Sequence, residues 1–219
     1  MDLLPLHRSI IAVDIEGSTS PLRTDPIRGD LRRAVHAMLC AALERAGVGP
    51  ARCEPFEDRG DGALVLVRPS DEVPKTYLLS RFVPELHRLL AEYDRALPAE
   101  EWPSRGLRLR AVVHAGEVHR DEFGYFGEAL DVACRLLDAR QLKRRLRCAA
   151  GPLAVVVSDE IYRCVVRHGY EGIPCDGYLP DVRVLVGGRR RQGWVHVPEA
   201  RALEAAPVLR AVPAGPPAA

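Results

Sequence analysis

The stretch FEDRGDGALVLV, residues 56–67, decides how this chain folds. It starts at Phe56, bends at the acidic, glycine-rich segment DRGDG (58–62) and continues as an apolar run to Val67. Two short β-type segments joined by such a bend are typical of a β-hairpin. The hairpin predicts an antiparallel sheet, around which the remaining segments are arranged.

Further strands and helices are predicted on both sides of this hairpin. The β-branched run SIIAVDI (9–15) predicts a buried strand, and Asp25 before Pro26 predicts an N-cap followed by a helix. Apolar spacing extends this helix to residue 47 and predicts others over 75–97, from 130 toward 145 and from 159 onward. Strands are predicted over 107–115, where Gly116 interrupts or ends the run, over 154–158, and over 182–186 and 193–197 as a hairpin.

This order of elements predicts an α+β sandwich, with helices packed on a mainly antiparallel sheet. A chain of 219 residues with 47% hydrophobic side chains can bury one substantial core, so one domain is expected. We place that domain at residues 1–197. Residues 198–219 are rich in alanine and proline and predict a disordered tail.

Charge and cysteine content exclude several classes of protein. The 31 basic and 30 acidic side chains nearly cancel, so no global field attracts nucleic acid or an anionic membrane, and any phosphate recognition must be local. The six cysteines form no C-x-x-C pair, which argues against a zinc knuckle or a disulfide framework. We expect ordinary buried thiols, no membrane-spanning segment and a cytoplasmic protein.

Two aspartates carry the clearest chemical signal. Asp14 and Asp61 each lie where a predicted strand meets a glycine-containing turn. Magnesium prefers one or two carboxylates together with phosphate oxygens, and a pair of ions stabilises the attacking and leaving oxygens of an in-line displacement. The backbone amides of residues 15–19, next to Asp14, are suited to holding a triphosphate.

Two other interpretations of these aspartates stay open at this point. Aspartate is common in turns, so Asp14 and Asp61 are also consistent with simple turn formation. The start D-x-E-G-S at Asp14 also matches haloacid-dehalogenase-like phosphatases. That fold requires a parallel sheet and a downstream lysine, whereas this chain is poor in lysine and predicts hairpins.

Four segments together resemble the successive motifs of class III nucleotidyl cyclases, in order and in spacing. They are VDIEGSTS (13–20), FEDRGDGALVLV (56–67), LRLRAVVHAGEVHRDEFGYFGEALDVACRLLDA (107–139) and VLVGGRRRQGWVHV (184–197). The resemblance covers roughly residues 7–197. It implies a ferredoxin-like βαββαβ core, a head-to-tail homodimer with active sites between the subunits, and closure of a nucleoside triphosphate into a 3′,5′-cyclic mononucleotide with release of pyrophosphate.

The resemblance also implies roles for individual residues. Asp14 and Asp61, with the carbonyl of Ile15, match the ligands of two divalent cations, Mg²⁺ or Mn²⁺. The triphosphate would lie along Ile15, Glu16, Gly17, Ser18 and Thr19. Arg135 matches the arginine that stabilises the transition state, and Asp131 replaces an asparagine that orients the ribose. Arg189, in the cluster 189–191, stands where the family has a lysine for the terminal phosphates.

The positions that select the base match neither purine code of the family. Glu57 agrees with guanylate cyclases, but its partner position is Gly124 instead of aspartate or cysteine, and Arg59 adds a possible base or phosphate contact. This mismatch is similar to the stand-alone cyclases of bacterial Pycsar antiphage systems, which make cyclic UMP or cyclic CMP. A pyrimidine product is therefore expected over a purine one.

Several alternatives remain open on sequence alone. Asp131 and Arg135 match an i,i+4 ion pair on a helix surface, and arginines at 189–191 match an exposed hairpin turn. The chain is also consistent with a degenerate cyclase fold kept as a nucleotide-binding or dimerisation module, or with a metal-dependent phosphatase or nuclease. His114 and His119 are left out of the site, and Trp102 and Trp194 are interpreted as packing residues.

Overall fold

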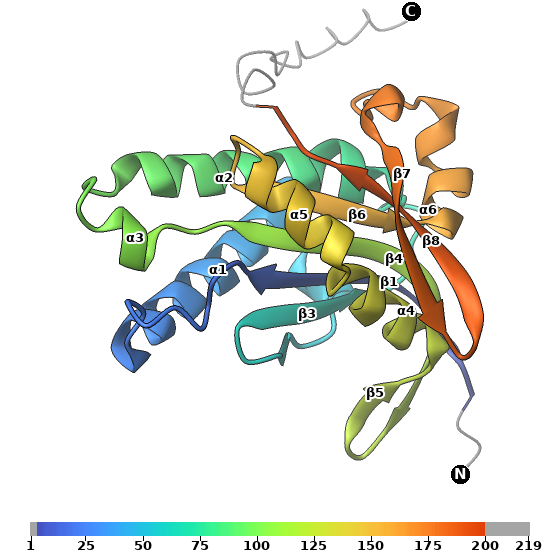
Figure 1. The fold of residues 1–219 in the computed structure, drawn as a ribbon. Coiled ribbons are helices and arrows are strands. Elements are labelled where there is room, and N and C mark those ends of the chain that lie inside the picture. The colour runs from blue at the N-terminus through green and yellow to red at the C-terminus, as the bar shows by residue number, and fades with distance from the viewer. Residues whose placement is uncertain (1–3, 200–219) are drawn as a thin grey trace, which may run out of the picture.

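The computed structural model describes residues 4–199, which are built around one twisted sheet. Its strands are β1 (Leu6–Ile15), β2 (Glu57–Asp58), β3 (Gly62–Val67), β4 (Leu109–Asp121), β5 (Gly124–Phe126), β6 (Leu153–Ser158), β7 (Leu179–Val186) and β8 (Arg189–His196). The spatial order is β2-β3-β1-β4-β6-β8-β7, with β5 paired to β4 (Figure 1). The pair β4–β6 is parallel and the other pairs are antiparallel, so the predicted α+β fold with a mainly antiparallel sheet is confirmed.

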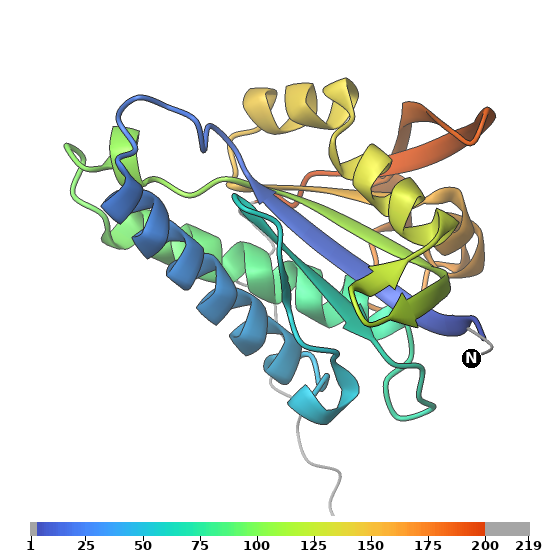
Figure 2. The same ribbon diagram turned by 90° about the horizontal axis from the view of Figure 1, so that it is seen from below.

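Helices cover both faces of this sheet. They are α1 (Asp25–Arg45), α2 (Val83–Ala96), α3 (Trp102–Arg105), α4 (Glu128–Leu137), α5 (Arg140–Cys148) and α6 (Asp159–Cys164), and a π-helical turn η2 (Leu78–Phe82) leads into α2. Short 3₁₀ turns are η1 (Pro50–Arg52), η3 (Val166–His168) and η4 (Cys175–Gly177). Figure 2 shows α1 and α2 on one side of the sheet and α4 and α5 on the other. This arrangement creates two cores that share the sheet.

The alternation of side chains along β1 explains why both faces are covered. Ile11 and Val13 lie in the core beneath α1 and α2, whereas Ile10 and Ala12 lie in the core beneath α4 and α5. Successive residues of a strand point to opposite faces, so a strand that is apolar at every position needs helices on both. By the same alternation, Asp14 belongs to the face that α4 and α5 cover.

Two predicted elements end differently from the expectation. Strand β4 does not end at Gly116 but pairs through it with Arg8 and continues to Asp121. A Cβ on Gly116 would lie 2.8 Å from the Cβ of Ala129, so this glycine lets α4 pack closely instead of terminating the strand. The helix predicted to continue past residue 137 is broken by the extended backbone of Ala139, which separates α4 from α5.

Two local expectations were also wrong. Thr24, not Asp25, is the N-cap of α1, and its side chain makes no capping hydrogen bond. The six cysteines are free, as expected, but none is fully buried. Cys53 and Cys175 are half-buried, and the other four are exposed because they occupy outward positions of helices.

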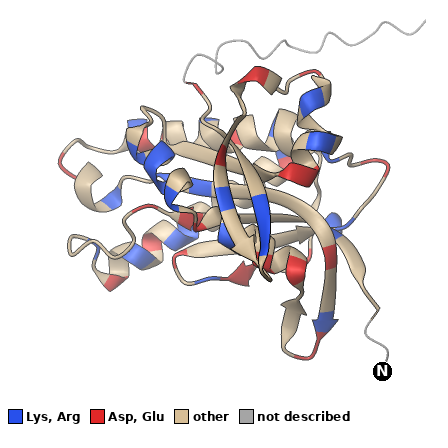
Figure 3. Ribbon diagram, turned by 45° about the vertical axis from the view of Figure 1, so that its right-hand side comes forward, with Lys and Arg blue, Asp and Glu red and all other residues tan. Residues whose placement is uncertain are grey.

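The distribution of charged residues agrees with the small net charge of the chain. Figure 3 shows basic and acidic positions interspersed over the elements of the sheet and helices, so the small net charge results from mixing. None of the helices in residues 4–199 is long and apolar enough to span a membrane. The predicted tail from residue 200 onward lies outside the described residues.

Candidate active site

The two predicted metal aspartates lie at the ends of neighbouring strands. Asp14, next to last in β1, is paired in register with Gly62 of β3, and Asp61 directly precedes that glycine. The amide of Ile15 donates a hydrogen bond to the carbonyl of Asp61 (3.1 Å), which closes the end of the strand pair. A Cβ on Gly62 would lie 2.1 Å from the carbonyl oxygen of Val13, so only glycine permits this close approach.

Each aspartate has a side-chain partner. Arg110 of β4 lies opposite Asp14 and forms an ion pair with its carboxylate, and the hydroxyl of Ser18 donates to the carboxylate of Asp61. Arg110 is 8% exposed, and burial lowers its pKa. Its Nε and Nη1 have no hydrogen-bond partner within residues 4–199. A buried guanidinium with free N–H groups beside Asp14 is an anion-binding feature.

Arg110 was missed by sequence reasoning. The sequence signal was that Arg110 alternates with apolar residues in a predicted strand. In the structure, Asp14 and Arg110 are paired residues on adjacent strands, and their side chains therefore share a face of the sheet. Recognising it requires the register of β1 against β4, which the sequence alone does not provide.

The loop after β1 offers fewer free amides than expected. The amide of Ile15 is bonded to Asp61 and that of Glu16 to the carbonyl of Arg108 (2.9 Å). The next three amides have no acceptor in the part of the chain that the structure describes. Gly17 has a φ of 68°, a left-handed conformation that favours glycine, so the loop turns sharply at this point. Of the backbone amides predicted to hold the triphosphate, only those of residues 17–19 are therefore free to do so within the described residues.

A cavity of about 410 Å³ lies beside this loop and Asp61. It is bounded by the end of β1, the loop that follows, the first turns of α1 and the bend between β2 and β3. Its lining residues are Ile15, Ser18, Thr19, Arg23, Asp25, Arg28, Gly29, Leu31, Arg32, Gly60 and Asp61. Asp14 is not among them, because it belongs to the opposite face of the sheet.

The predicted base-selecting residues lie together. Arg59 Nη2 donates to Glu57 Oε2 (2.9 Å), and a Cβ on Gly124 would lie 3.7 Å from Glu57 Oε1. Cys134 of α4 lies within the electrostatic reach of both charged groups, and although the residue is exposed, partial desolvation of its thiol is the main reason that its pKa is raised. The structure therefore brings β2, the β4–β5 hairpin and α4 to one place, with a carboxylate and a guanidinium side by side.

Asp131 and Arg135 are exposed on α4, next to this group. Across residues 4–199 the two side chains form no ion pair with each other. No recorded hydrogen bond or ion pair in the same residues links either side chain to Asp14 or Asp61. Within residues 4–199, hydrogen bonds and ion pairs therefore do not join Asp131 and Arg135 to the two aspartates.

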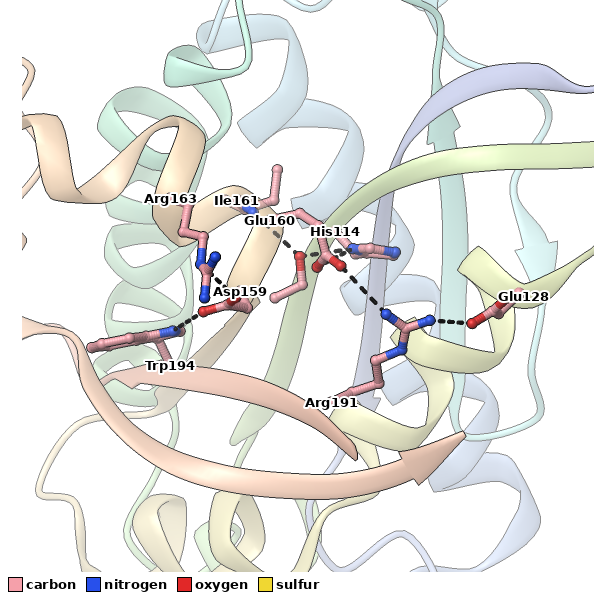
Figure 4. Close-up of polar contacts among 9 residues, drawn as sticks. His114, Glu128, Asp159, Glu160, Ile161, Arg163, Arg191 and Trp194 are labelled. Atoms are coloured by element: carbon pink, nitrogen blue, oxygen red, sulfur yellow. Dashed lines mark hydrogen bonds and ion pairs between the residues drawn. The ribbon is translucent and has the colours of Figure 1, made fainter. Parts of the chain in front are cut away.

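The arginines of the last hairpin differ from one another. Arg191 forms an ion pair with Glu128 at the start of α4 and lies 3.9 Å from a carboxylate oxygen of Glu160 (Figure 4). Arg189 and Arg190 are exposed at the start of β8, after a tight turn. No hydrogen bond or ion pair within residues 4–199 links Arg189 to the other predicted site residues, so its phosphate role remains a prediction.

His114 is a core residue, as the sequence analysis expected. It is 4% exposed, and its Nδ1 lies 2.7 Å from the hydroxyl of Ser158. That hydroxyl also accepts a hydrogen bond from the amide of Ile161. Burial lowers the pKa of His114 to about 4. Trp194 likewise packs, stacking on Tyr162. The network in Figure 4 thus connects β4, α4, α6 and β8 and is structural.

The carboxylates present suit Mg²⁺ or Mn²⁺ bound together with a substrate. No group of three or more His, Cys, Asp or Glu side chains in residues 4–199 is arranged to hold a metal alone. Mg²⁺ rarely uses such a cage and binds through one or two carboxylates plus phosphate oxygens. Asp14 and Asp61, at adjacent strand ends, provide that partial set.

Comparison with solved structures identifies the class of fold. The crystal structure of an adenylate/guanylate cyclase/hydrolase from Silicibacter pomeroyi matches with a TM-score of 0.60 and 18% identity, over 90% of this chain and 99% of that one. The guanylyl cyclase Cya2 matches with a TM-score of 0.59 and 15% identity, over 91% of this chain and 97% of that one. The adenylyl cyclase CyaB from P. aeruginosa also matches with a TM-score of 0.59, at 14% identity, over 92% of this chain and 98% of that one.

These matches establish that the chain has the fold of the class III cyclases over nearly its whole described length. Searches of family models and of curated proteins found no match to the sequence. At such low identity the shared property is the fold, and the activity has to be argued from the site.

Proposed function

We propose that this protein is a nucleotidyl cyclase that converts a nucleoside triphosphate into a 3′,5′-cyclic mononucleotide and pyrophosphate. The observation that carries the proposal is the position of Asp14 and Asp61 at adjacent strand ends, joined by the hydrogen bond from Ile15 to Asp61. The cyclase fold of the solved neighbours supports it. Turn formation alone does not account for Asp14, which lies within β1 and pairs with a buried arginine.

The residues of this chain would contribute to the reaction in two ways, by binding the metal ions and the triphosphate and by stabilising negative charge on the phosphates. Asp14, Asp61 and the Ile15 carbonyl would hold two divalent cations, Mg²⁺ or Mn²⁺, which when bound acidify the ribose 3′-hydroxyl and neutralise phosphate charge. The free amides of residues 17–19 and the free N–H groups of Arg110 would contact phosphate oxygens. The 3′-oxygen attacks the α-phosphorus, the hydroxyl proton passes to solvent, and the bond to the bridging oxygen breaks to release pyrophosphate.

The site would be completed by a second copy of the chain. Asp131 and Arg135 are exposed on α4, and within residues 4–199 neither forms a hydrogen bond or ion pair with Asp14 or Asp61. In a head-to-tail homodimer, α4 of one copy would face Asp14 and Asp61 of the other. Arg135 would then stabilise the transition state, and Asp131 would accept a hydrogen bond from the ribose.

A pyrimidine triphosphate is the proposed substrate, with cyclic UMP or cyclic CMP as an antiphage signal. The pair Glu57 and Arg59 presents an acceptor and a donor, and Gly124 contributes no side chain. This departs from both purine codes, which supports the resemblance to the Pycsar cyclases. The solved neighbours named above are adenylyl and guanylyl cyclases, so the base assignment rests on these residues alone.

A nucleotide-binding module without turnover is the second candidate. Asp131 favours it, because a carboxylate in place of the usual amide adds negative charge beside a triphosphate. Incubation with ATP, GTP, CTP and UTP in Mn²⁺, followed by mass spectrometry, separates the two candidates. A cyclic product that disappears in Asp61→Ala supports the cyclase and names its base. Nucleotide binding without any cyclic product supports the module.

A further inference from the structure

The cavity beside Asp61 has a wall of arginines that the roles above leave unused. Its volume of about 410 Å³ falls within the range of roughly 300–1,000 Å³ that is usual for small-ligand sites. Arg23, Arg28 and Arg32 all line it. Sequence reasoning did not select any of the three.

Arg23 is a fixed, buried donor in this wall. It is 7% exposed, and its Nη1 and Nη2 donate to the carbonyls of Glu16 and Gly106, both at 2.8 Å. Its Nε has no hydrogen-bond partner among residues 4–199. An unpaired buried donor costs about 1–3 kcal/mol, which a ligand that supplies an acceptor would recover.

Arg28 and Arg32 are the more exposed part of the wall. They lie one turn apart on α1 and therefore on the same face of the helix. Each has one weak surface partner: Arg28 lies 3.4 Å from Asp25, whose side chain is 93% exposed, and Arg32 pairs with the exposed Asp58. Such pairs contribute about 1 kcal/mol or less, so an anion of higher charge can replace them.

The charge of the lining selects the kind of ligand. The three arginines outnumber the two acidic lining residues, Asp25 and Asp61, so the lining has a net positive charge. The planar guanidinium fork matches phosphate oxygens, and several forks together favour a polyphosphate over a single carboxylate. Asp61 and Ser18, on the same lining, connect the cavity to the candidate metal site.

We infer that this cavity binds the terminal phosphates of the substrate, and then the pyrophosphate product, through Arg28 and Arg32 with the Nε of Arg23 as a third donor. The inference rests on the proposed function, which supplies the triphosphate. Negative charge accumulates on the leaving pyrophosphate as the bond from the α-phosphorus to the bridging oxygen breaks. Arginines at this position stabilise that charge.

Calorimetric titration of the full chain with inorganic tripolyphosphate in Mg²⁺ tests this site without requiring turnover. Arg28→Ala and Arg32→Ala should each weaken binding about tenfold, which corresponds to about 1.4 kcal/mol. The matched control is Arg33→Ala, because Arg33 is a 76% exposed arginine of the same helix that does not line the cavity. This control should stay within about twofold of the unmodified protein, and circular dichroism should verify that each variant is folded.

The possible outcomes separate this inference from the proposed function. If tripolyphosphate does not bind, or binds equally to the double variant Arg28→Ala/Arg32→Ala, the inference is overturned. If binding depends on both arginines but no triphosphate yields a cyclic product, the polyphosphate site stands and the cyclase proposal fails. If a cyclic product forms while pyrophosphate inhibition is unchanged in the double variant, the cyclase stands and the arginine wall is not its phosphate site.

Discussion

The carboxylate of Asp14 forms an ion pair with the guanidinium of Arg110, its direct neighbour across strands β1 and β4. Only 19% of the Asp14 side chain and 10% of the Arg110 side chain are exposed. Desolvated charges depend strongly on each other, because removal of one leaves the other buried without compensation. The candidate metal site is therefore also part of what stabilises the strand pair.

Breaking this pair should destabilise the fold. Arg110→Ala and Asp14→Asn should each lower the free energy of unfolding by about 3 kcal/mol, as is usual when one partner of a buried pair is lost. The double variant should lose about 1–3 kcal/mol less than the sum of the single losses. Urea unfolding of the four proteins measures this coupling. Additive losses would mean that the two side chains do not interact in solution.

Gly116→Ala should displace α4. The added methyl group would lie 2.8 Å from the Cβ of Ala129, so α4, which carries Asp131 and Arg135, has to shift. Overpacking of this kind costs about 1–3 kcal/mol, and any activity should fall with it. Thermal unfolding measures the loss. Gly49→Ala is the control, because no atom lies within 4 Å of its added Cβ. Equal stability of the two variants would contradict the close packing described here.

Acidification should weaken the fold through His114. Burial lowers its pKa from 6.5 to about 4, against the opposing effect of Glu160. Between these two pH values the unfolded chain binds a proton that the folded chain excludes, so stability falls as the pH decreases from about 6.5 to 4. The contribution is on the order of 3 kcal/mol.

His114→Gln should make that decrease with pH shallower, because glutamine has no proton to bind in the unfolded state. Denaturant unfolding at several pH values measures the slope for this variant and for the unmodified protein. The exposed His168 provides the comparison His168→Gln, which should keep the original slope. An unchanged slope in His114→Gln would show that other groups cause the acid sensitivity.

A shared site predicts complementation between two inactive variants. Asp61→Ala removes a proposed metal ligand, and Arg135→Ala removes the arginine proposed to stabilise the transition state. Random dimers of the two proteins should recover about a quarter of the unmodified activity, because half of them are mixed and each has one intact site. Cyclic-nucleotide production after co-refolding measures this. Activity no higher than that of the single variants would contradict a site between two copies.

The main elements of the fold were predictable because their signals are local. Continuous apolar, β-branched runs marked β1 and β3, and the bend from Asp58 to Gly62 marked the hairpin between β2 and β3. The boundaries at Gly116 and Ala139 were predicted wrongly, because their conformations are set by packing of α4 and α5 on the sheet. That packing depends on residues far apart in sequence.

The site was predictable only in part for the same reason. Asp14 and Asp61 are marked by their positions at strand ends, whereas Arg110 becomes visible only when the register of β1 and β4 is known. The arginines of α1 resemble any solvated helical face until a cavity is found in front of them. The two amides of residues 15 and 16 were assigned to phosphate, but strand pairing uses them.

The most direct test of the central claim is a mass balance of the reaction. The full chain is incubated with each of the four nucleoside triphosphates and Mn²⁺, and cyclic nucleotide, pyrophosphate and inorganic phosphate are quantified together, beside Asp61→Ala. A cyclase produces cyclic nucleotide and pyrophosphate in equal amounts from its preferred triphosphate, and the variant produces neither. Release of inorganic phosphate without a cyclic product, or equal turnover by Asp61→Ala, would contradict the assignment of this site.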